Sequence, residues 1–532
     1  MIEKTFEIKS EWLFFPVWNT VGEEPEKETL EIFCEEPGGR KKLFEFQVLA
    51  KVPGAEENCP IRYYARFPVK QFTDKTLILR GELPEAFFDA VTTNDIVAVA
   101  LQQSSAAAGA SVRPSIHFTP ETGWMNDPNG LVYADGYYHL YFQHNPFDIR
   151  WENMSWGHAR SRDLLHWEQK ADVLFPDENG TMFSGSGIVN EKELLGLPPE
   201  TLLFFYTAAG DTIPWNRGKE ASQHVAYSLD GGMTLHKTEK GTLDTVEHEN
   251  RDPKVFWHGE SGAYIMVLWL DKNDFGIFRS ADLEHWTQSD RITLDQAWEC
   301  PDLMCLTDES GGKHWMFFSA DGFYFWGTFD GYQFKTDGIR HEAYINHIPY
   351  AAQTYSGVHG RTISIPWLRM PNRGRNYTGA MGLPREFRVC VIDGEKLLCQ
   401  MPVREYERVK CSVEFIKNDA ADEVCYQKDG SGAVELQVQR KKEQRQIAWE
   451  INGMVISYDA DTGRFCAGEE EFKIRTDVSD FSFLLDDVIV EVTAGYGTII
   501  GVFELLKNGV ELLTRRSYFE KMQLFLEELW RP

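Results

Sequence analysis

"SRDLLHWEQ" (residues 161–169) and "SADLEHWTQ" (residues 280–288) are two copies of one short pattern, and they decide the fold expected for the middle of the chain. Two further segments, "SLDGGMTLHK" (228–237) and "TFDGYQFKT" (328–336), share with them only an aspartate in a hairpin-like setting. The successive starts of the four segments differ by 67, 52 and 48 residues. This spacing is close to the length of one four-stranded propeller blade.

The sequence around these segments is a succession of short strands and tight turns. "GLVYADGYYHLYFQ" (130–143) is typical of a β-hairpin, because Asp135 and Gly136 stand between two strand-like runs. A β-sandwich does not require a repeated hairpin, and a parallel β-helix repeats at shorter periods, so a propeller is favoured. Residues 116–395 have room for five blades of roughly 55 residues each. We therefore predict a five-bladed β-propeller there.

Both flanks of this region are expected to be rich in β-structure. Residues 1–104 alternate apolar and polar side chains, as in "KLFEFQVLAKV", and predict an extra β-rich N-terminal domain. The small and polar run "QQSSAAAGASVRPS" places a linker at residues 105–115. Residues 396–532 hold short strands such as "AVELQVQ" between turn residues, which predicts a C-terminal β-sandwich. The fold class is thus all-β, with a propeller followed by a sandwich.

The composition of the chain excludes some functions. Its 54 basic and 82 acidic residues give a net charge of −28, which disfavours nucleic acid or an anionic membrane as a partner. The nine cysteines are scattered without a CxxC pair, which argues against a zinc site and a disulfide framework. The N-terminus has no signal-peptide pattern and the apolar run "AYIMVLWL" is short. We therefore expect a cytoplasmic protein, unless a leader has been removed.

Three carboxylates in the predicted propeller stand beside Pro, Trp or Arg. They are Asp127 in "MNDPNG", Asp252 in "NRDPKV" and Glu299 in "AWECPDL", and a small polar loop, "FSGSG" (183–187), accompanies them. Each signal alone is weak, because an Asp before Pro most often forms a turn and an Arg–Asp neighbour pair is common on surfaces. Their order and joint occurrence carry the argument.

Well-separated carboxylates on a β-scaffold fit the cleavage of a glycosidic bond. One carboxylate attacks the anomeric carbon or activates water, and another protonates the leaving oxygen. The aromatic and apolar neighbours of Glu299 favour its protonated form, which suits the acid. Turn N–H groups around Asp127, and Arg251 beside Asp252, are expected to keep these two carboxylates ionised.

Seven separated motifs together resemble glycoside hydrolase family 32, the β-fructosidases, which include invertases, inulinases, levanases and sucrose-6-phosphate hydrolases. They are "HFTPETGWMNDPNGLVY", "FSGSG", "RDPKV", "WECPDL", "YYHLYFQHNP", "WGHARSRDLLHWE" and "YTGAMGLPREF". The resemblance covers residues 113–395 well and the predicted sandwich more loosely, through "FLLDDVIVEVTAGYG". The first hundred residues lie outside it.

The resemblance implies a five-bladed propeller with a funnel-shaped pocket on its axis, followed by a β-sandwich. Carried over by motif, it makes Asp127 the nucleophile and Glu299 the general acid/base, and Asp252 binds fructose hydroxyls and stabilises the transition state. The substrate-binding residues that it implies are Asn126, Gln143, Trp151, Phe183, Ser184 and Arg251.

The residues and the resemblance together predict a glycosidase that releases terminal β-D-fructofuranosyl units from sucrose or fructans through a covalent fructosyl-enzyme. The only partner expected is this carbohydrate substrate, and no metal or cofactor is required, because proton transfer and electrostatics cover both chemical steps. A fructosyltransferase stays open as an alternative, since transfer and hydrolysis share the intermediate. A catalytically silent carbohydrate-binding propeller, or an inverting glycosidase acting on arabinan or xylan, is disfavoured by the three intact motifs.

Several finer points stay open at the level of sequence. The segments "INHIPYAAQTY" and "SIPWLR" depart from the family pattern near the outer subsites, so sucrose, levan, inulin and short fructo-oligosaccharides are not ranked. An exo-acting enzyme is favoured, because a pocket on a propeller axis closes around one terminal sugar. The N-terminal domain could bind carbohydrate, form a dimer or pack against the propeller, and packing is the default expectation. The oligomeric state is left open.

Overall fold

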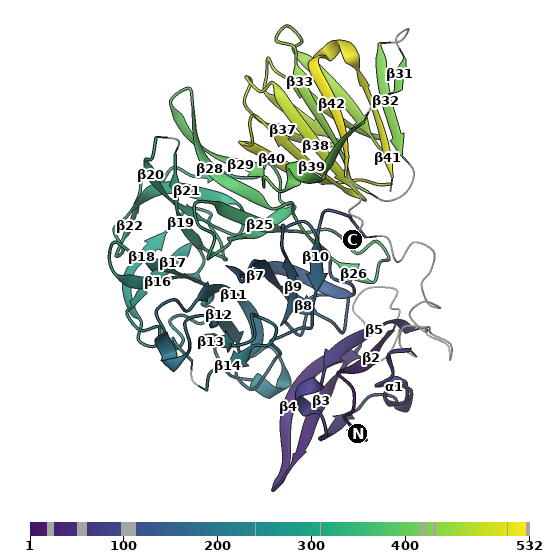
Figure 1. Ribbon diagram of the computed structural model, residues 1–532, viewed down its shortest axis with the longest axis vertical. Coiled ribbons are helices and arrows are strands. Elements are labelled where there is room, and N and C mark those ends of the chain that lie inside the picture. Colours follow the sequence, from purple (N-terminus) through teal and green to yellow (C-terminus); the bar gives the residue numbers. More distant parts are fainter. Residues whose placement is uncertain are drawn as a thin grey trace.

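The chain forms an all-β structure with three parts, as the computed structural model shows (Figure 1). The structure describes residues 1–18, 26–50, 61–96, 113–239, 241–308, 310–413, 416–418, 422–428, 432–507 and 509–527. The helices within them are α1 (Glu85–Ala90) and the short 3-10 helices η1 (Lys70–Phe72), η2 (Leu194–Gly196), η3 (Pro214–Asn216), η4 (Tyr406–Val409) and η5 (Arg516–Tyr518). None of the helices in these ranges is long and apolar enough to cross a membrane.

Five antiparallel sheets form the central part and are the blades of a propeller. The first contains β7 (Gly123–Ala134), β8 (Tyr137–Asn145), β9 (Ser155–Ser161) and β10 (Trp167–Gln169). The second contains β11 (Thr181–Val189), β12 (Leu202–Ala209), β13 (Ser222–Ser228) and β14 (His236–Lys237). The third contains β15 (Arg251–His258), β16 (Ala263–Asp271), β17 (Asp274–Ser280) and β18 (Thr287–Thr293).

The fourth and fifth blades complete the ring. The fourth contains β19 (Asp302–Thr307), β20 (Lys313–Phe318), β21 (Phe323–Phe329) and β22 (Phe334–Thr336), with β23 (His341–Glu342) on β21. The fifth contains β24 (Pro349–Thr354), β25 (Thr362–Leu368), β28 (Arg385–Ile392) and β29 (Glu395–Pro402), with β27 (Ala380–Met381) on β25. The connection from β25 to β28 also supplies β26 (Tyr377–Thr378), which pairs in parallel with β7 and joins the last blade to the first.

The four repeated aspartate segments are the same turn in successive blades. Asp163, Asp230, Asp282 and Asp330 each lie between the third and fourth strands of a blade, where they accept backbone N–H bonds from the turn. These bonds, together with side-chain bonds from His166 to Asp163 and from His285 to Asp282, outweigh the partial burial of Asp163 and Asp230 and lower the pKa of all four carboxyls. The propeller predicted from this repeat is confirmed.

The innermost strands meet in a polar contact on the axis. Lys254 of β15 is 7% exposed, and its Nζ lies 2.9 Å from Asp302 Oδ2 of β19. The same nitrogen donates to the carbonyl of Thr354 in β24 at 2.7 Å, and the Thr354 N–H donates to Asp302 Oδ2 at 2.8 Å. Three blades are therefore joined by one buried, hydrogen-bonded ion pair.

Two packed sheets form the C-terminal sandwich. The first contains β30 (Lys410–Val413), β42 (Phe519–Glu527), β33 (Val434–Arg440), β38 (Asp480–Asp486), β39 (Ile489–Ala494) and β40 (Ile499–Glu504). The second contains β31 (Ile416–Asn418), β32 (Glu423–Lys428), β41 (Val510–Arg515), β34 (Gln446–Ile451), β35 (Met454–Asp459), β36 (Arg464–Ala467) and β37 (Glu470–Lys473). Trp449 and Phe483 pack between the sheets with ring centroids 4.6 Å apart.

The predicted boundary between residues 395 and 396 falls at the start of β29. This strand pairs with β28 across a turn at Asp393 and Gly394, both with positive φ, so the propeller extends to Pro402 and the sandwich begins with β30. The predicted linker, 105–115, lies largely outside the described residues.

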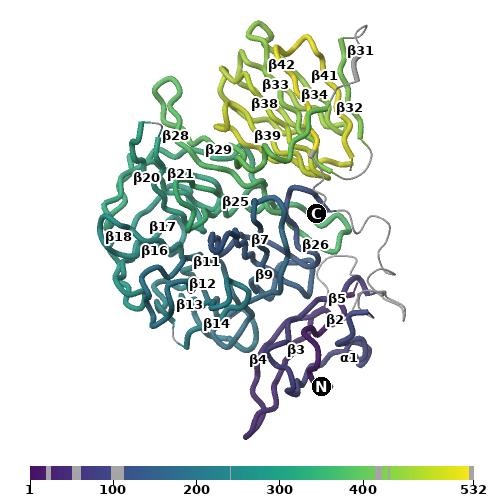
Figure 2. Tube along the Cα trace, viewed as in Figure 1, coloured from purple at the N-terminus to yellow at the C-terminus, as the bar shows by residue number. Residues whose placement is uncertain are grey.

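The N-terminal part lies against the propeller, beside the first two blades (Figures 1 and 2). One sheet contains β1 (Ile2–Glu7), β6 (Thr76–Gly81), β3 (Lys27–Glu36) and β4 (Gly39–Leu49), and a second contains β2 (Trp12–Trp18) and β5 (Ile61–Pro68). Its apolar core includes two propeller residues, Phe147 and Phe175, the latter 4.8 Å from the ring of Phe67. The N-terminal part and the propeller therefore share one hydrophobic core.

Removing the axial lysine should destabilise the propeller. We expect Lys254→Met to lower the free energy of unfolding by about 3–5 kcal/mol, because Asp302 is then left as an unpaired buried charge. Urea unfolding followed by intrinsic fluorescence measures the change. The double variant Lys254→Met/Asp302→Leu should recover most of the loss, and a single variant as stable as the parent would contradict the assigned role of the pair.

Candidate active site

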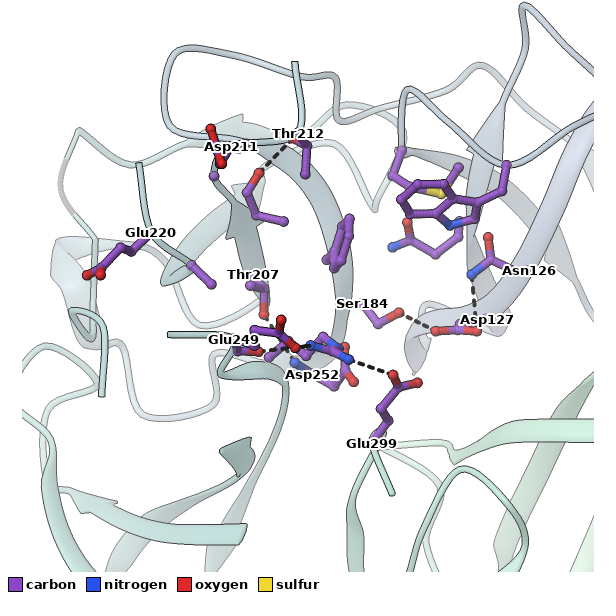
Figure 3. A pocket seen from close by; sticks show the side chains of 18 of the residues that line it. Asn126, Asp127, Ser184, Thr207, Asp211, Thr212, Glu220, Glu249, Asp252 and Glu299 are labelled. Carbon is purple, nitrogen blue, oxygen red and sulfur yellow. Dashed lines mark hydrogen bonds and ion pairs between the residues drawn. The ribbon is translucent and has the colours of Figure 1, made fainter. Parts of the chain in front are cut away.

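A cavity of about 550 Å³ opens at the axis of the propeller. All nine residues that the sequence placed in a site line this one cavity, although they come from three blades and from the segment that leads into the fourth. Figure 3 shows Asn126, Asp127, Ser184, Asp252 and Glu299 around it. They are Asn126, Asp127, Gln143, Trp151, Phe183, Ser184, Arg251, Asp252 and Glu299. The structure thus brings together residues that are separated by up to 173 positions in the chain.

The innermost strands lose their regular pairing where they reach the cavity. The breaks lie in β7 between Met125 and Pro128, in β11 between Met182 and Gly185, in β15 between Arg251 and Lys254, and in β24 between Tyr350 and Gln353. An irregularity of this kind bends a strand and re-aims its side chains. The side chains of Asp127, Ser184 and Asp252 lie within these breaks and face the cavity.

Strained backbone accompanies the site. Asp252, Glu299, Cys300 and Ala351 have φ angles of 65°, 46°, 38° and 49°, in the left-handed region that non-glycine residues rarely adopt. Such conformations persist where surrounding contacts hold them, and they cluster at functional sites. Here the strained residues lie directly before β19 begins, where Glu299 lines the cavity and the Cys300 N–H donates to Asp252.

Asp127 is held by three side-chain donors. Its Oδ2 accepts hydrogen bonds from Ser184 Oγ at 2.7 Å and from Cys300 Sγ at 3.6 Å, and its Oδ1 accepts one from Asn126 Nδ2 at 3.1 Å. Asn126 is in turn fixed by the Trp124 indole N–H, which donates to its Oδ1 at 2.8 Å. These contacts leave the Asp127 carboxylate in one orientation, beside the open space of the cavity.

Asp252 is more deeply buried, with 6% of its surface exposed. Its Oδ2 accepts the Cys300 backbone N–H at 3.1 Å and lies 3.5 Å from the Cys300 Sγ, whose single hydrogen can be donated to Asp252 or to Asp127 but not to both at once. Cys300 therefore bridges Asp252 and Asp127, because its thiol lies within reach of both carboxylates.

The electrostatic surroundings expected for the two aspartates are corrected by the structure, because burial, rather than a stabilising neighbour, has the largest effect on the pKa of each. Burial raises the pKa of Asp252 to about 7, since the Arg251 charge does not offset desolvation together with the Glu299 and Asp127 charges. Burial also raises the pKa of Asp127, and the hydrogen bonds from Ser184 and Asn126 only reduce the shift. A charged neighbour in the sequence was a poor guide to the pKa of Asp252, because burial by several blades cannot be read from a short segment of sequence.

Glu299 has more polar surroundings than its sequence neighbours indicated. Its Oε1 accepts from Arg251 Nη2 at 2.6 Å and its Oε2 accepts from the Tyr350 hydroxyl at 3.1 Å. The Arg251 guanidinium lies 3.9 Å above the ring of Trp269, which fixes it in place. The expectation of apolar company is thus corrected to an ion pair at the side of the cavity.

Some cavity residues were not found from the sequence. Tyr350 and Trp367 lie in the two segments whose departure from the family pattern was noted, and that departure was the available signal. Thr207, whose hydroxyl accepts the Asp252 N–H at 3.1 Å, belongs to an apolar strand that gave no signal. Asp211 and Thr212 belong to a loop that the sequence did not mark.

Two polar groups in the cavity wall have no partner among the described residues. The carboxamide oxygen Oε1 of Gln143 is a buried acceptor, and the indole N–H of Trp367 is a buried donor. Leaving such groups unpaired is costly, so both lower the stability of the free site. Across the described ranges, no group of three or more His, Cys, Asp or Glu side chains is placed to hold a metal ion.

A family model for the glycosyl hydrolases family 32 N-terminal domain matches residues 117–402, which is just over half of the chain. A levanase of Bacillus subtilis is 32% identical over 339 residues, covering 58% of this chain and 49% of the levanase. An invertase of Debaryomyces hansenii is 36% identical over 283 residues, covering 48% and 52%. The chain thus spans about half the length of these two relatives.

Solved structures show the same architecture. A fructofuranosidase from Schwanniomyces occidentalis complexed with fructose superposes with a TM-score of 0.68 at 25% identity, covering 80% of this chain and 99% of that one. A glycoside hydrolase family 32 structure from Bifidobacterium adolescentis superposes over the whole of both chains, with a TM-score of 0.66 at 19% identity. The second likeness concerns the fold alone, and it includes the N-terminal part.

The raised pKa of Asp252 should make stability depend on pH. The folded protein holds this proton more tightly than the unfolded chain, so the cost of ionisation is absent near pH 4 and complete above about pH 7. Asp252→Asn should therefore match the parent near pH 4 and be more stable than it at pH 8. Urea unfolding at a series of pH values measures this.

Asp282→Asn provides the control of opposite sign. The backbone N–H of His285 lowers the Asp282 pKa, so this carboxylate stabilises the fold above the ordinary pKa and the benefit is lost as the pH falls. The control should be less stable than the parent at pH 7 and approach it in acid. A constant difference between Asp252→Asn and the parent from pH 4 to pH 8 would contradict the assignment.

Proposed function

Because this chain belongs to glycoside hydrolase family 32, we propose that it is a retaining β-fructofuranosidase, which hydrolyses terminal β-D-fructofuranosyl units from sucrose or fructans. The observation that carries the proposal is the convergence of Asp127, Asp252 and Glu299 in one axial cavity, each held by different partners. Curated relatives named levanase, invertase and exo-inulinase support the substrate class.

The first step forms a covalent intermediate. Asp127 attacks C2 of the fructosyl unit, and the bond from C2 to the leaving oxygen breaks as Glu299 gives its proton to that oxygen. The hydrogen bonds from Ser184 and Asn126 fix the direction of the Asp127 carboxylate, so little reorientation is needed before attack.

The second step returns the enzyme to its starting state. Glu299 takes a proton from water, the water oxygen attacks C2, and the ester bond to Asp127 breaks, so the product has the configuration of the substrate. Arg251 and Tyr350, which hold the two oxygens of Glu299 in the free site, keep this carboxylate in place between the steps.

Asp252 is assigned to binding and transition-state stabilisation. It lies with Asp127 around Cys300, so a sugar ring attached to Asp127 lies within reach of its carboxylate. Charge-assisted hydrogen bonds to ring hydroxyls strengthen as positive charge develops at C2.

Transfer of the fructosyl group to another sugar is the second candidate function. It shares the covalent intermediate and differs only in whether water or a sugar hydroxyl attacks C2. The cavity continues beyond the three carboxylates to Asp211, Thr212 and Glu220, which leaves room for an acceptor sugar (Figure 3). The ratio of free fructose to longer oligosaccharides formed from concentrated sucrose separates the two functions.

The two catalytic carboxylates should have separable kinetic effects. We expect Asp127→Ala and Glu299→Ala each to lower kcat on sucrose by about 10²–10⁴-fold or more, since one removes the nucleophile and the other the proton donor. With a fructoside whose leaving group needs no protonation, azide should restore turnover in Glu299→Ala with retained configuration, because a small anion can attack the fructosyl-enzyme without a general base, whereas any azide product of Asp127→Ala should have inverted configuration. Steady-state kinetics and product analysis measure both effects.

Glu260→Gln serves as the matched control, since this exposed glutamate of the third blade pairs with Lys313 far from the cavity. It should keep the parent's kcat and KM. Near-parental turnover in purified, folded Asp127→Ala or Glu299→Ala would refute the assignment. Products from sucrose, inulin and levan then test the substrate: fructose alone from all three would establish exo-hydrolysis.

A further inference from the structure

The loop between β8 and β9 (146–154) joins the cavity to the N-terminal part. Near its start, Phe147 enters the N-terminal core, where its ring lies 4.5 Å from Phe46 and 5.5 Å from Phe15. Further along, Trp151 lines the cavity with 51% of its surface exposed and its ring 6.0 Å from Phe183. This short loop thus contacts the N-terminal core through Phe147 and the cavity through Trp151.

Strand β4 holds the end of this loop through the Asn153 side chain, whose amide bonds to both backbone groups of Gln47, as a paired strand would. The Gln47 N–H donates to Asn153 Oδ1 at 2.7 Å, and the Gln47 carbonyl accepts from Asn153 Nδ2 at 2.8 Å. Asn153 is 2% exposed and has a φ of 51°, so its backbone conformation is held by these contacts. The same amide also donates to Asn145 Oδ1 at 3.2 Å.

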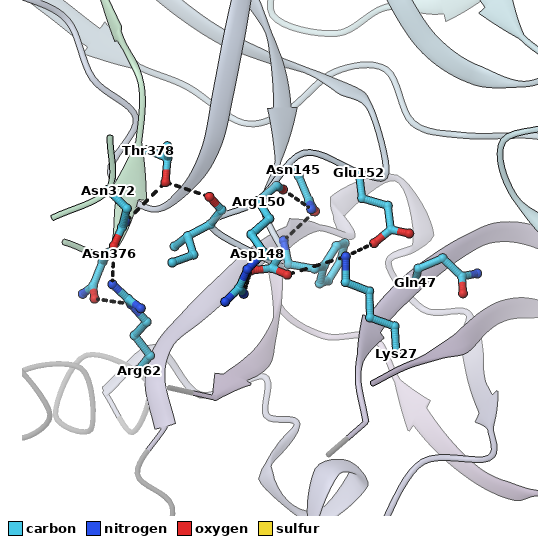
Figure 4. Close-up of polar contacts among 12 residues, drawn as sticks. Lys27, Gln47, Arg62, Asn145, Asp148, Arg150, Glu152, Asn372, Asn376 and Thr378 are labelled. Carbon is cyan, nitrogen blue, oxygen red and sulfur yellow. Dashed lines mark hydrogen bonds and ion pairs between the residues drawn. The ribbon is translucent and has the colours of Figure 1, made fainter. Parts of the chain in front are cut away.

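Strand β3 adds a charged anchor through Lys27, which lies between Asp148 and Glu152 of this loop (Figure 4). Lys27 forms an ion pair with Glu152 and lies 3.7 Å from Asp148 Oδ2, while Asp148 Oδ1 accepts from Arg150 at 3.0 Å. The Lys27 side chain is 22% exposed and that of Asp148 is 3% exposed, so the contact is partly shielded from water. The residues that flank Trp151 are therefore held by the N-terminal sheet.

A second loop at the cavity is held by the same sheet. Asp211 and Thr212 line the cavity, and the Trp215 N–H, three residues on, donates to Glu45 Oε1 at 2.9 Å. Glu45 is 2% exposed, and Lys42, which pairs with it at 2.5 Å, lies 4.8 Å above the Trp215 ring. Two cavity loops thus have their anchors on β3 and β4.

We propose that the N-terminal part is a positioning element of the active site, which holds Trp151 and the Asp211–Thr212 loop and so sets the affinity for the substrate beyond its terminal fructosyl unit. This inference rests on the proposed function. Asp211 and Thr212 lie at the far end of the cavity from Glu299 and Asp252 (Figure 3). A half-exposed indole offers a face on which a sugar ring can stack.

A purely structural role makes a different prediction. If the N-terminal part only covers apolar surface, weakening its contacts should lower stability and leave the kinetic constants of the folded enzyme unchanged. A positioning role should raise KM without lowering kcat, because the reacting groups on the axis keep their own contacts. It should also affect a tetrasaccharide such as nystose more than sucrose, since the longer substrate reaches further along the cavity.

The test removes the Lys27 anchor. Lys27→Met should raise KM for nystose about three- to tenfold with kcat unchanged. Lys27→Arg should have the KM of the parent, since it keeps the positive charge. Arg40→Met is the matched control, because Arg40 pairs with exposed Glu3 on the same sheet. Glu45→Gln weakens the second anchor, should produce the same KM effect, and keeps the test decisive if Lys27→Met does not fold.

A double-mutant cycle separates action through Trp151 from a general effect. In a Trp151→Ala background, Lys27→Met should cause no further rise in KM. Hydrogen–deuterium exchange provides a readout that does not need activity: residues 146–153 should exchange faster in Lys27→Met and not in Arg40→Met. Unchanged KM and unchanged exchange in Lys27→Met would overturn the inference, as would equal KM effects with and without Trp151. A parent enzyme that releases no fructose would instead refute the proposed function.

Discussion

The buried pair of Lys254 and Asp302 is the contact on which the geometry of the site depends. Lys254 follows Asp252 by two residues, and Asp302 follows Glu299 by three. Because both charged groups are bonded to each other and to Thr354, β15, β19 and β24 of three different blades are held together at the axis. An apolar contact at this place could slide, whereas a buried, hydrogen-bonded ion pair has a single favourable arrangement. The two carboxylates are thus fixed by residues that do not touch the substrate.

This arrangement lowers the stability of the fold, through the electrostatics of the site and through its backbone conformation. Desolvation raises the pKa of Asp252 and Asp127, and like charges nearby add to the shift for both. Glu299 and Cys300 also adopt strained φ angles. Every one of these features lowers the stability of the fold, so the rest of the propeller must offset them. The stabilising free energy comes from the hydrogen bonds between strands and from the aspartate turns of the blades, which lie away from the axis.

The sequence was sufficient to predict features that repeat along the chain and features that lie within a single motif. The Asp turns revealed the blades, and the motifs around Asp127 and Glu299 identified residues that line one cavity. Contacts across blades could not be predicted: Arg251 lies beside Asp252 in the chain but bonds to Glu299, 48 residues away. The protonation of Asp252 depends on burial by several strands, and the end of the propeller at Pro402 depends on which sheet β29 joins. No single segment contains such information.

The cavity therefore combines two kinds of support. The reacting groups lie in or beside the irregular segments of inner strands, where hydrogen bonds from neighbouring blades and the axial ion pair hold them. The residues at its outer end lie on loops, which lack a ladder of their own and depend on β3 and β4 for their anchors. Because these loops depend on contacts from β3 and β4, changes in the N-terminal sheet can alter what the outer end accepts without disturbing the axis. A module outside the catalytic propeller can in this way influence substrate choice while contacting none of the three carboxylates in the described structure.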